Sequence, residues 1–225
     1  DDFLAAMADA NDADLGQFRR WYSQSGTPVL DIVGSYNAAS REYLLHVKQS
    51  CPPTPGQQEK VPSLVPLAVG LLDPDGRDLP LRQPGEPAAT TGTRVLQVDG
   101  AEQSFTFINI PAAPVPSLLR GFSAPVRVNY PYSADELAFL FACDSDPFNR
   151  WEAGQRLATQ VLLAMIADLQ AGRPAVVSEP FVAAFRSALT DAAADPALLA
   201  LALTLPGEIE LAEAMTVADP GAVHA

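Results

Sequence analysis

The side chains of this chain that could bind a transition metal are few and widely separated. A hydrolytic zinc site needs about three protein ligands and an open position for water, but the only histidines are His46 and His224. No His-Glu-x-x-His motif is present, and neither Cys51 nor Cys143 belongs to a Cys-x-x-Cys pair. His46 lies in a stretch of alternating apolar and polar residues, which places it on a solvent-facing strand surface. We therefore predict that this chain has no metal ligands and no cofactor of its own.

Two short acidic segments could bind a cation, and both have simpler structural interpretations. Residues 73–76 have the sequence Asp-Pro-Asp-Gly, whereas a calcium-binding EF-hand loop has glycine at its sixth position and glutamate at its twelfth. Here glycine is fourth and the twelfth residue is Pro84, so a tight turn between apolar runs is predicted. In Asp144-Ser145-Asp146, the last aspartate precedes Pro147, which is typical of a helix N-cap followed by proline.

Motifs for other catalytic chemistries are absent from the sequence. There is no Gly-x-Ser-x-Gly nucleophile elbow and no glycine-rich loop that would hold a phosphate. The 27 acidic residues leave acid–base catalysis by two carboxylates open, but no spacing singles out a pair. The prediction for catalytic, cofactor-binding and metal-binding residues is accordingly none.

The composition excludes several classes of partner. The chain has 225 residues, 48% of them hydrophobic, and a net charge of −13. Such acidity disfavours nucleic acid, and no apolar run approaches the ~20 residues that cross a bilayer. The first residues, Asp1 and Asp2, bring neither an initiator methionine nor the basic start of a signal peptide, which favours an excised fragment. Two cysteines and the lack of an Asn-x-Ser/Thr sequon are typical of a cytoplasmic protein.

Proline and alanine divide the chain into a β region and an α region. Residues 27–132 contain 15 of the 21 prolines, whereas residues 133–225 contain 23 alanines. Proline separates short strands and alanine favours helix. The α region also holds 13 acidic and 4 basic side chains, which is typical of a solvated helix surface.

The β region predicts a β-sandwich of immunoglobulin type. Residues 41–49, 103–107 and 126–130 alternate between apolar and polar side chains, as half-buried strands do. Seven or eight short antiparallel strands are expected in a region of this length. The Cys-Trp-Cys signature of antibody domains is absent, so the prediction concerns the architecture alone.

The α region predicts a series of antiparallel helices. Their starts are marked by N-cap residues: Ser133 with Glu136 as a capping box, and Asp146, Ser178 and Asp195, each followed closely by proline. The helix that begins after Asp146 is expected to reach about Ala171 and to end at Gly172. Successive helices of this kind can stack as a solenoid.

Residues 1–26 predict two short amphipathic helices, the second ending at Gly26. One face of the first helix carries Phe3, Leu4 and Met7. Because isolated helices of this length are marginal in water, they must pack on the sandwich or on a part of the protein outside this sequence. Trp21 and Trp151 each lie on a predicted helix face, and we expect both to serve packing rather than ligand binding.

Three segments carry more specific information: residues 18–28 (FRRWYSQSGTP), 122–126 (FSAPV) and 144–155 (DSDPFNRWEAGQ). In that order they resemble the end of the catalytic domain, the closing strands of the β-sandwich and the start of the C-terminal helical domain of bacterial aminopeptidase N, a family of zinc-dependent gluzincins. The resemblance covers essentially the whole chain. It implies an internal fragment of a four-domain exopeptidase.

The resemblance implies a division into three parts. Residues 1–26 would be the helical tail of the catalytic domain, residues 27–132 the immunoglobulin-like spacer domain, and residues 133–225 the first helices of the C-terminal α-helical domain. The expected fold is thus an all-β sandwich between a short helical segment and a helical array.

The resemblance also implies a function for the parent protein, which would remove N-terminal amino acids from peptides with a zinc-activated water. The family's zinc-binding and amine-binding motifs are absent here, so this chain is expected to be a non-catalytic interdomain scaffold. Its partners would be the remaining domains of the same polypeptide, and zinc and peptide substrates would belong to the parent. The alternative is a stand-alone β-sandwich and helical module that binds proteins through a strand edge or its acidic helices. An independent hydrolase is least favoured, because no catalytic constellation is found.

Overall fold

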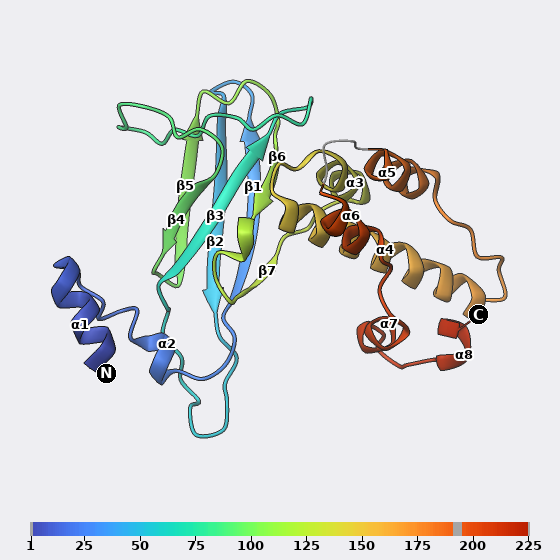
Figure 1. Ribbon diagram of the computed structural model, residues 1–225, viewed down its shortest axis with the longest axis horizontal. Helices are drawn as coiled ribbons and strands as arrows, with labels where there is room; N and C mark the ends of the chain where they lie inside the picture. The colour runs from blue at the N-terminus through green and yellow to red at the C-terminus, as the bar shows by residue number, and fades with distance from the viewer. Residues whose placement is uncertain (1, 191–194, 225) are drawn as a thin grey trace. The chain divides into compact units, whose positions relative to one another are not determined.

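The computed structural model describes residues 2–190 and 195–224. Asp1, one of the two residues on which the prediction of an excised fragment rests, lies outside the described residues. The chain forms two compact units (Figure 1). The β-unit comprises the residues up to Asp73 together with Asp78–Pro131, and the helical unit comprises Pro74–Arg77 together with the residues from Tyr132 onward.

The β-unit contains two sheets. The four-stranded sheet has the order β5-β2-β1-β7 and the three-stranded sheet the order β4-β3-β6. The strands are β1 (Val29–Asn37), β2 (Glu42–Ser50), β3 (Val65–Leu72), β4 (Arg94–Val98), β5 (Glu102–Ile108), β6 (Val115–Leu118) and β7 (Arg127–Asn129). This arrangement confirms the predicted sandwich architecture.

The core of the β-unit lies between the inner faces of its sheets. In β2 the side chains of Tyr43, Leu45 and Val47 are buried and alternate with exposed or half-buried residues, as the sequence predicts. In β3 nearly every side chain is buried, so this strand shows no alternation. Phe107 of β5 is also fully buried. Apolar side chains from both sheets therefore form one continuous interior.

The strand β7 departs from the predicted antiparallel pattern. It pairs in parallel with β1, with Val29 opposite Arg127 and Leu30 opposite Val128. The preceding strand β6 belongs to the other sheet, and parallel neighbours need such a crossover rather than a hairpin. The expectation that every strand is antiparallel is thus wrong for β7.

The N-terminal helices differ in length from the prediction. Helix α1 (Asp2–Asn11) buries Leu4 but leaves Phe3 and Met7 exposed. Helix α2 (Arg20–Ser23) has a single turn and ends before Gly26, which lies beyond it at φ +96°. The predicted end at Gly26 is wrong, because the chain is already extended at Gln24.

The helical unit follows the predicted caps closely. Its helices are α3 (Ala134–Cys143), α4 (Pro147–Gln170), α5 (Glu179–Leu189), α6 (Pro196–Leu203), α7 (Glu208–Ala214) and α8 (Pro220–His224). Ser133 and Glu136 form the capping box of α3, and Asp146 accepts a hydrogen bond from the Asn149 amide at the start of α4. Ser178 occupies the N-cap position of α5 without a side-chain hydrogen bond. None of the helices among the described residues has the length and apolar character needed to cross a bilayer.

Close contact between α3 and α4 forms the centre of the helical unit. Leu137, Leu140 and Phe141 of α3 and Leu157 of α4 are buried. Gly154 lies so close to Phe141 that a Cβ atom there would be 2.9 Å from the ring. The absent side chain therefore permits the approach of the two helices.

Candidate functional site

Within the part of the chain that the structure describes, no group of three or more histidine, cysteine, aspartate or glutamate side chains is arranged to hold a metal ion. Cys51 and Cys143 are both free thiols. Burial raises the pKa of the Cys143 thiol, which keeps it protonated and weakly nucleophilic. The described residues thus do not form a site that fits a zinc ion, and the prediction of no catalytic residues stays a prediction.

His224 lies in α8 and contacts a residue of α7. Its Nδ1 is 3.0 Å from Oε1 of Glu208 in α7. The hydrogen bond to that carboxylate, together with its charge, raises the pKa of His224. Both side chains are exposed, so the pair is a surface contact between two helices.

The two acidic segments have the structural roles that the sequence predicts. Gly76 is at φ +80° in the turn after β3, and a Cβ atom there would lie 2.6 Å from Cβ of Cys143. Asp144 is buried, and its Oδ1 accepts a hydrogen bond of 2.9 Å from the Asp146 amide. The Asp146 carboxylate in turn caps α4. The carboxylates of Asp144 and Asp146 thus accept hydrogen bonds from backbone amides at the start of α4.

A serine, a histidine and a glutamate meet on the outer face of the four-stranded sheet. His46 of β2 lies directly opposite Ser104 of β5 in the strand register. Its Nδ1 is 3.0 Å from Ser104 Oγ, and its Nε2 is 2.9 Å from Glu102 Oε1. The two ring nitrogens of His46 therefore join a hydroxyl to a carboxylate. We call Ser104, His46 and Glu102 the sheet-face triad.

The protonation of the sheet-face triad follows from its partners. The Glu102 carboxylate can only accept a hydrogen bond, so Nε2 of His46 carries a proton. In the neutral ring Nδ1 is then an acceptor, and Ser104 donates its hydroxyl proton to it. A hydroxyl next to a base that is oriented by a third group is the arrangement that activates a serine nucleophile. The side chains are 38% exposed for His46 and 55% for Glu102, so solutes can reach them.

Sequence reasoning placed His46 on an exposed strand face but missed its two neighbours. Alternation in residues 41–49 and 103–107 indicates which side chains share a face of one strand. It does not show which residues of β2 and β5 stand opposite each other, because that register depends on pairing across more than fifty residues. Only the folded sheet brings the triad together.

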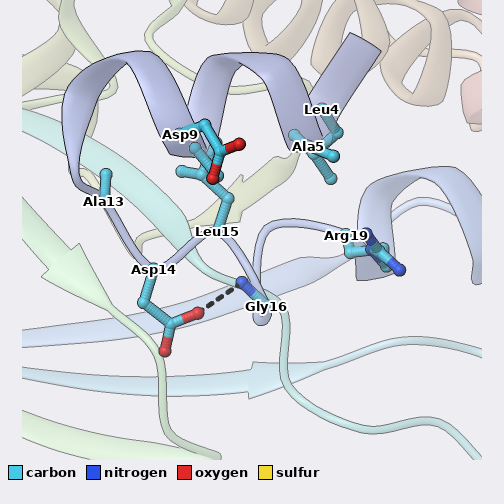
Figure 2. Close-up of a pocket in the computed structure, with 9 residues that line it drawn as sticks. Leu4, Ala5, Asp9, Ala13, Asp14, Leu15, Gly16 and Arg19 are labelled. Atoms are coloured by element: carbon cyan, nitrogen blue, oxygen red, sulfur yellow. Dashed lines mark hydrogen bonds between the residues drawn. The ribbon is translucent and has the colours of Figure 1, made fainter. Parts of the chain in front are cut away.

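A pocket of about 310 Å³ lies between α1 and the turn that follows it (Figure 2). Its apolar surface includes Leu4 and Leu15, and Asp9 and Asp14 add carboxylates. Oδ1 of Asp14 accepts a hydrogen bond of 2.8 Å from the Gly16 amide. This carboxylate therefore stabilises the turn, and polar and apolar side chains share the lining of the pocket.

A second pocket, of about 280 Å³, lies in the helical unit beside α3, α4 and α6. Phe141 and Leu198 give it an apolar lining, and Arg150 and Asp195 are its charged residues. Asp195 caps α6 through the Ala197 amide at 2.9 Å. Nε of Arg150 is 3.3 Å from the carbonyl oxygen of Phe141. These two polar side chains therefore bind backbone groups in the last turn of α3 and at the start of α6.

The two tryptophans have packing and hydrogen-bonding roles. Trp21 donates its indole N–H to the carbonyl oxygen of Leu64 at 2.8 Å. The ring of Trp151 in α4 lies 5.6 Å from that of Phe148, centroid to centroid. Each tryptophan is half-buried, so both contribute to packing, as expected from the sequence.

Residues 17–25, which we call the N-terminal strap, are held to the β-unit by hydrogen bonds. Gln24 exchanges side-chain hydrogen bonds with the backbone of Val61 at 2.9 and 3.0 Å. Gln57 accepts from the Ser25 amide and donates to the Ser23 carbonyl, both at 2.8 Å. Trp21 adds the bond to Leu64. The strap is therefore an integral part of the β-unit surface.

Two domain families match the chain in succession. Residues 26–131 match DUF3458, described as a domain of unknown function with an Ig-like fold. Residues 134–225 match DUF3458_C, described as a domain of unknown function with ARM repeats. These matches agree with a β-sandwich followed by helices, and they confirm the predicted fold class.

Proteins that are similar to this chain along nearly its whole length are named aminopeptidases. The chain is 43% identical over 223 residues to aminopeptidase N of Escherichia coli (strain K12), with 99% of this chain and 25% of that protein aligned. It is 40% identical over 225 residues to aminopeptidase N of Haemophilus influenzae, again with 25% of that protein aligned.

A solved structure shows the same relationship in three dimensions. It is that of Legionella pneumophila aminopeptidase A in complex with aspartic acid, with a TM-score of 0.77 and 31% identity. The alignment covers 99% of this chain and 24% of that one. The chain thus spans about a quarter of the length of these relatives. On this combination of whole-chain identity, domain families and shared fold, the chain is homologous along its whole length to a region of bacterial aminopeptidase N.

Proposed function

We propose that this chain is an interdomain scaffold within a longer zinc-dependent aminopeptidase that removes N-terminal amino acids from peptides. Residues 1–26 would then end the catalytic domain, residues 27–132 would form the spacer and residues 133–225 the first helices of the C-terminal domain. Support comes from relatives named aminopeptidase N, in which the homologous region is about a quarter of the protein. Zinc and the catalytic groups would belong to other domains, which would be this chain's partners.

Exposed apolar side chains at the two ends of the chain carry this proposal. In α1, Phe3 is 73% exposed. Towards the C-terminus the exposed apolar residues are Leu198, Leu201, Leu205, Ile209 and Val217. We take these exposed apolar side chains at the ends of the chain as surfaces that other protein parts cover. A scaffold that joins domains needs such surfaces at both ends, whereas a stand-alone binding module needs only one.

The N-terminal strap supports a mechanical role for the β-unit. Its bonds to Val61, Leu64 and Gln57 hold residues 17–25 against the sandwich. Because these hydrogen bonds leave the strap little freedom to bend, the strap fixes the position of the preceding helix relative to the sandwich. This is the property that a scaffold between domains requires.

The test compares the 225-residue chain with the longer protein. Zinc content and hydrolysis of an aminoacyl p-nitroanilide are measured for both under the same conditions. We expect zinc and turnover only in the longer protein. Zinc with turnover in the 225-residue chain would overturn the scaffold assignment, and a longer protein without either would overturn the assignment to a zinc aminopeptidase.

We further propose that the protein works in the cytoplasm. Both cysteines are free thiols, as is usual in reducing compartments. Fractionation of the producing cells with an antibody against this region tests the location, and recovery of the protein outside the cytoplasmic fraction would contradict it.

A further inference from the structure

The sheet-face triad goes beyond a scaffold role, because a scaffold needs no activated hydroxyl. From its geometry we infer that Ser104 is an acylation site, which reacts with activated acyl esters faster than other exposed serines of this chain. His46 is the base that takes the hydroxyl proton, and Glu102 is the positioning residue that holds the ring. The inference does not depend on the proposed function of the chain.

The contacts of His46 determine which of its ring nitrogens accepts the serine proton. Its Nδ1 lies 3.0 Å from Ser104 Oγ, within the range in which a base can accept a proton directly. Its Nε2 is 2.9 Å from Glu102 Oε1. That carboxylate selects the ring tautomer with an unprotonated Nδ1 and stabilises the imidazolium when the proton arrives.

The triad lies on two paired strands of the four-stranded sheet. His46 and Ser104 are a directly opposed pair in the antiparallel ladder of β2 and β5. Glu102 lies two residues before Ser104 on the same face of β5. Sites built on paired strands keep their geometry better than sites on loops. The hydroxyl and the imidazole are thus held within reach of each other without help from a ligand.

The reaction is a simple acyl transfer. Ser104 Oγ attacks the carbonyl carbon of the ester, the new C–O bond forms, and the bond from that carbon to the leaving group breaks. The hydroxyl proton passes to Nδ1 of His46 and from there to the leaving alkoxide or phenoxide. Nothing is oxidised or reduced. An activated ester supplies its own good leaving group, so the acylation step can proceed on the open sheet face.

The sheet offers a matched control serine. Ser35 of β1 is exposed on the same outer face, where its strand partner is Leu44 instead of a histidine. The rates of acylation of Ser104, which contacts a histidine, and Ser35, which does not, can therefore be compared within the same chain. Lys48 on the same face can also be acylated, but its product is an amide, whereas the serine product is an ester that hydroxylamine cleaves.

The experiment treats the 225-residue chain with p-nitrophenyl acetate at neutral pH and follows each peptide by mass spectrometry. A positioned general base typically accelerates proton transfer by 10²–10⁴. For this open site we expect Ser104 to be acetylated roughly tenfold or more faster than Ser35. His46→Gln should reduce the Ser104 rate to that of Ser35, and Ser104→Ala should abolish the hydroxylamine-sensitive product at this position.

Glu102→Ala separates positioning from structure. We expect slower acetylation of Ser104 together with a mixture of His46 tautomers, read from the imidazole ¹⁵N chemical shifts, while circular dichroism stays that of the parent chain. Equal rates at Ser104 and Ser35, or a Ser104 rate that His46→Gln leaves unchanged, would overturn the inference. An unchanged tautomer and rate in Glu102→Ala would overturn the role of Glu102.

Discussion

Arg120 lies inside the β-unit with only 3% of its surface exposed. Its Nη2 donates to Oδ1 of Asp78 at 2.7 Å, and its Nε donates to Ser117 Oγ at 2.8 Å. Gly70 makes room for it, since a Cβ atom there would lie 2.2 Å from the guanidinium carbon. The buried positive charge of Arg120 is tolerated because its N–H groups donate hydrogen bonds to Asp78 and Ser117. Glycine is required at position 70 because the planar guanidinium group crosses β3 there.

Removal of one partner from this pair should be costly. Asp78→Asn takes away the negative charge beside a buried guanidinium, and we expect a loss of about 3 kcal/mol in the free energy of unfolding. Urea denaturation followed by tryptophan fluorescence measures it. The control is Asp168→Asn, which affects the exposed pair with Arg173 and should change stability by less than about 1 kcal/mol. Similar values for the two variants would contradict the assigned importance of the buried pair.

Glu86 makes the stability of the β-unit depend on acid pH. The hydrogen bond from Arg94 holds the pKa of Glu86 at about 2, below its ordinary value of 4.5. A carboxyl with a lower pKa in the folded state stabilises the protein above its unfolded pKa, and this contribution is lost as the pH falls through the folded value. We expect the stability advantage of the parent chain over Glu86→Gln to be full above about pH 5 and to vanish towards pH 2. Chemical denaturation at several pH values measures it, and a difference independent of pH would contradict this account.

At the scale of elements, the N-terminal strap is the feature with the clearest consequence. Gln57→Ala removes three hydrogen bonds to the strap, two of 2.8 Å with its backbone and one of 3.0 Å from Ser25 Oγ. The two backbone bonds each have a net contribution of about 1 kcal/mol. We expect amide hydrogen exchange in residues 17–25 to become about 30-fold faster, while exchange in β2 and β3 stays the same. The neighbouring exposed Gln58→Ala is the matched control. Equal exchange in the two variants would show that the strap is held by other contacts.

The helix starts were the elements best predicted from sequence, because their signals are local. The capping box of Ser133 and Glu136 and the Asp146 cap both appear in the structure with the expected hydrogen bonds. Strand alternation around Leu45 predicted the buried face of β2 correctly. Such patterns depend on a few neighbouring residues, so a single sequence contains them in full.

Features that depend on distant pairing could not be predicted. The parallel partner of β1, the bond from Trp21 to Leu64 and the approach of Ser104 to His46 each join residues far apart in sequence. The alternation of apolar and polar residues within one segment does not show which residues of another segment lie opposite it, so these contacts were missed. The candidate site was therefore found from the fold, whereas the prediction that zinc ligands lie elsewhere came from motifs.

For the whole molecule, the exposed apolar residues of the last helices connect structure to function. Ile209 and Leu201 are 76% and 59% exposed. Their combined replacement, Leu201→Ser with Ile209→Ser, should leave the melting temperature of the 225-residue chain nearly unchanged, since each exposed substitution costs less than about 0.5 kcal/mol. Self-association, measured by sedimentation velocity, should decrease.

The same pair of substitutions tests the scaffold proposal in the longer protein. There we expect a lower melting temperature, because covered apolar side chains lose their contacts. Ile209→Val with Leu201→Ile is the conservative control. A longer protein that tolerates the serine variant as well as the control would contradict the view that other domains cover these residues.

The parallel pairing of β1 and β7 also brings the two ends of the sandwich sequence together. Val29 is opposite Arg127, and the Arg127 amide donates to the Pro28 carbonyl at 2.9 Å. Between position 127 and position 131 a strand advances about 13 Å, so the chain leaves the sandwich a short distance from where it entered. The points where the chain enters and leaves the sandwich are therefore near neighbours, so a short linker would span the distance between positions 28 and 131.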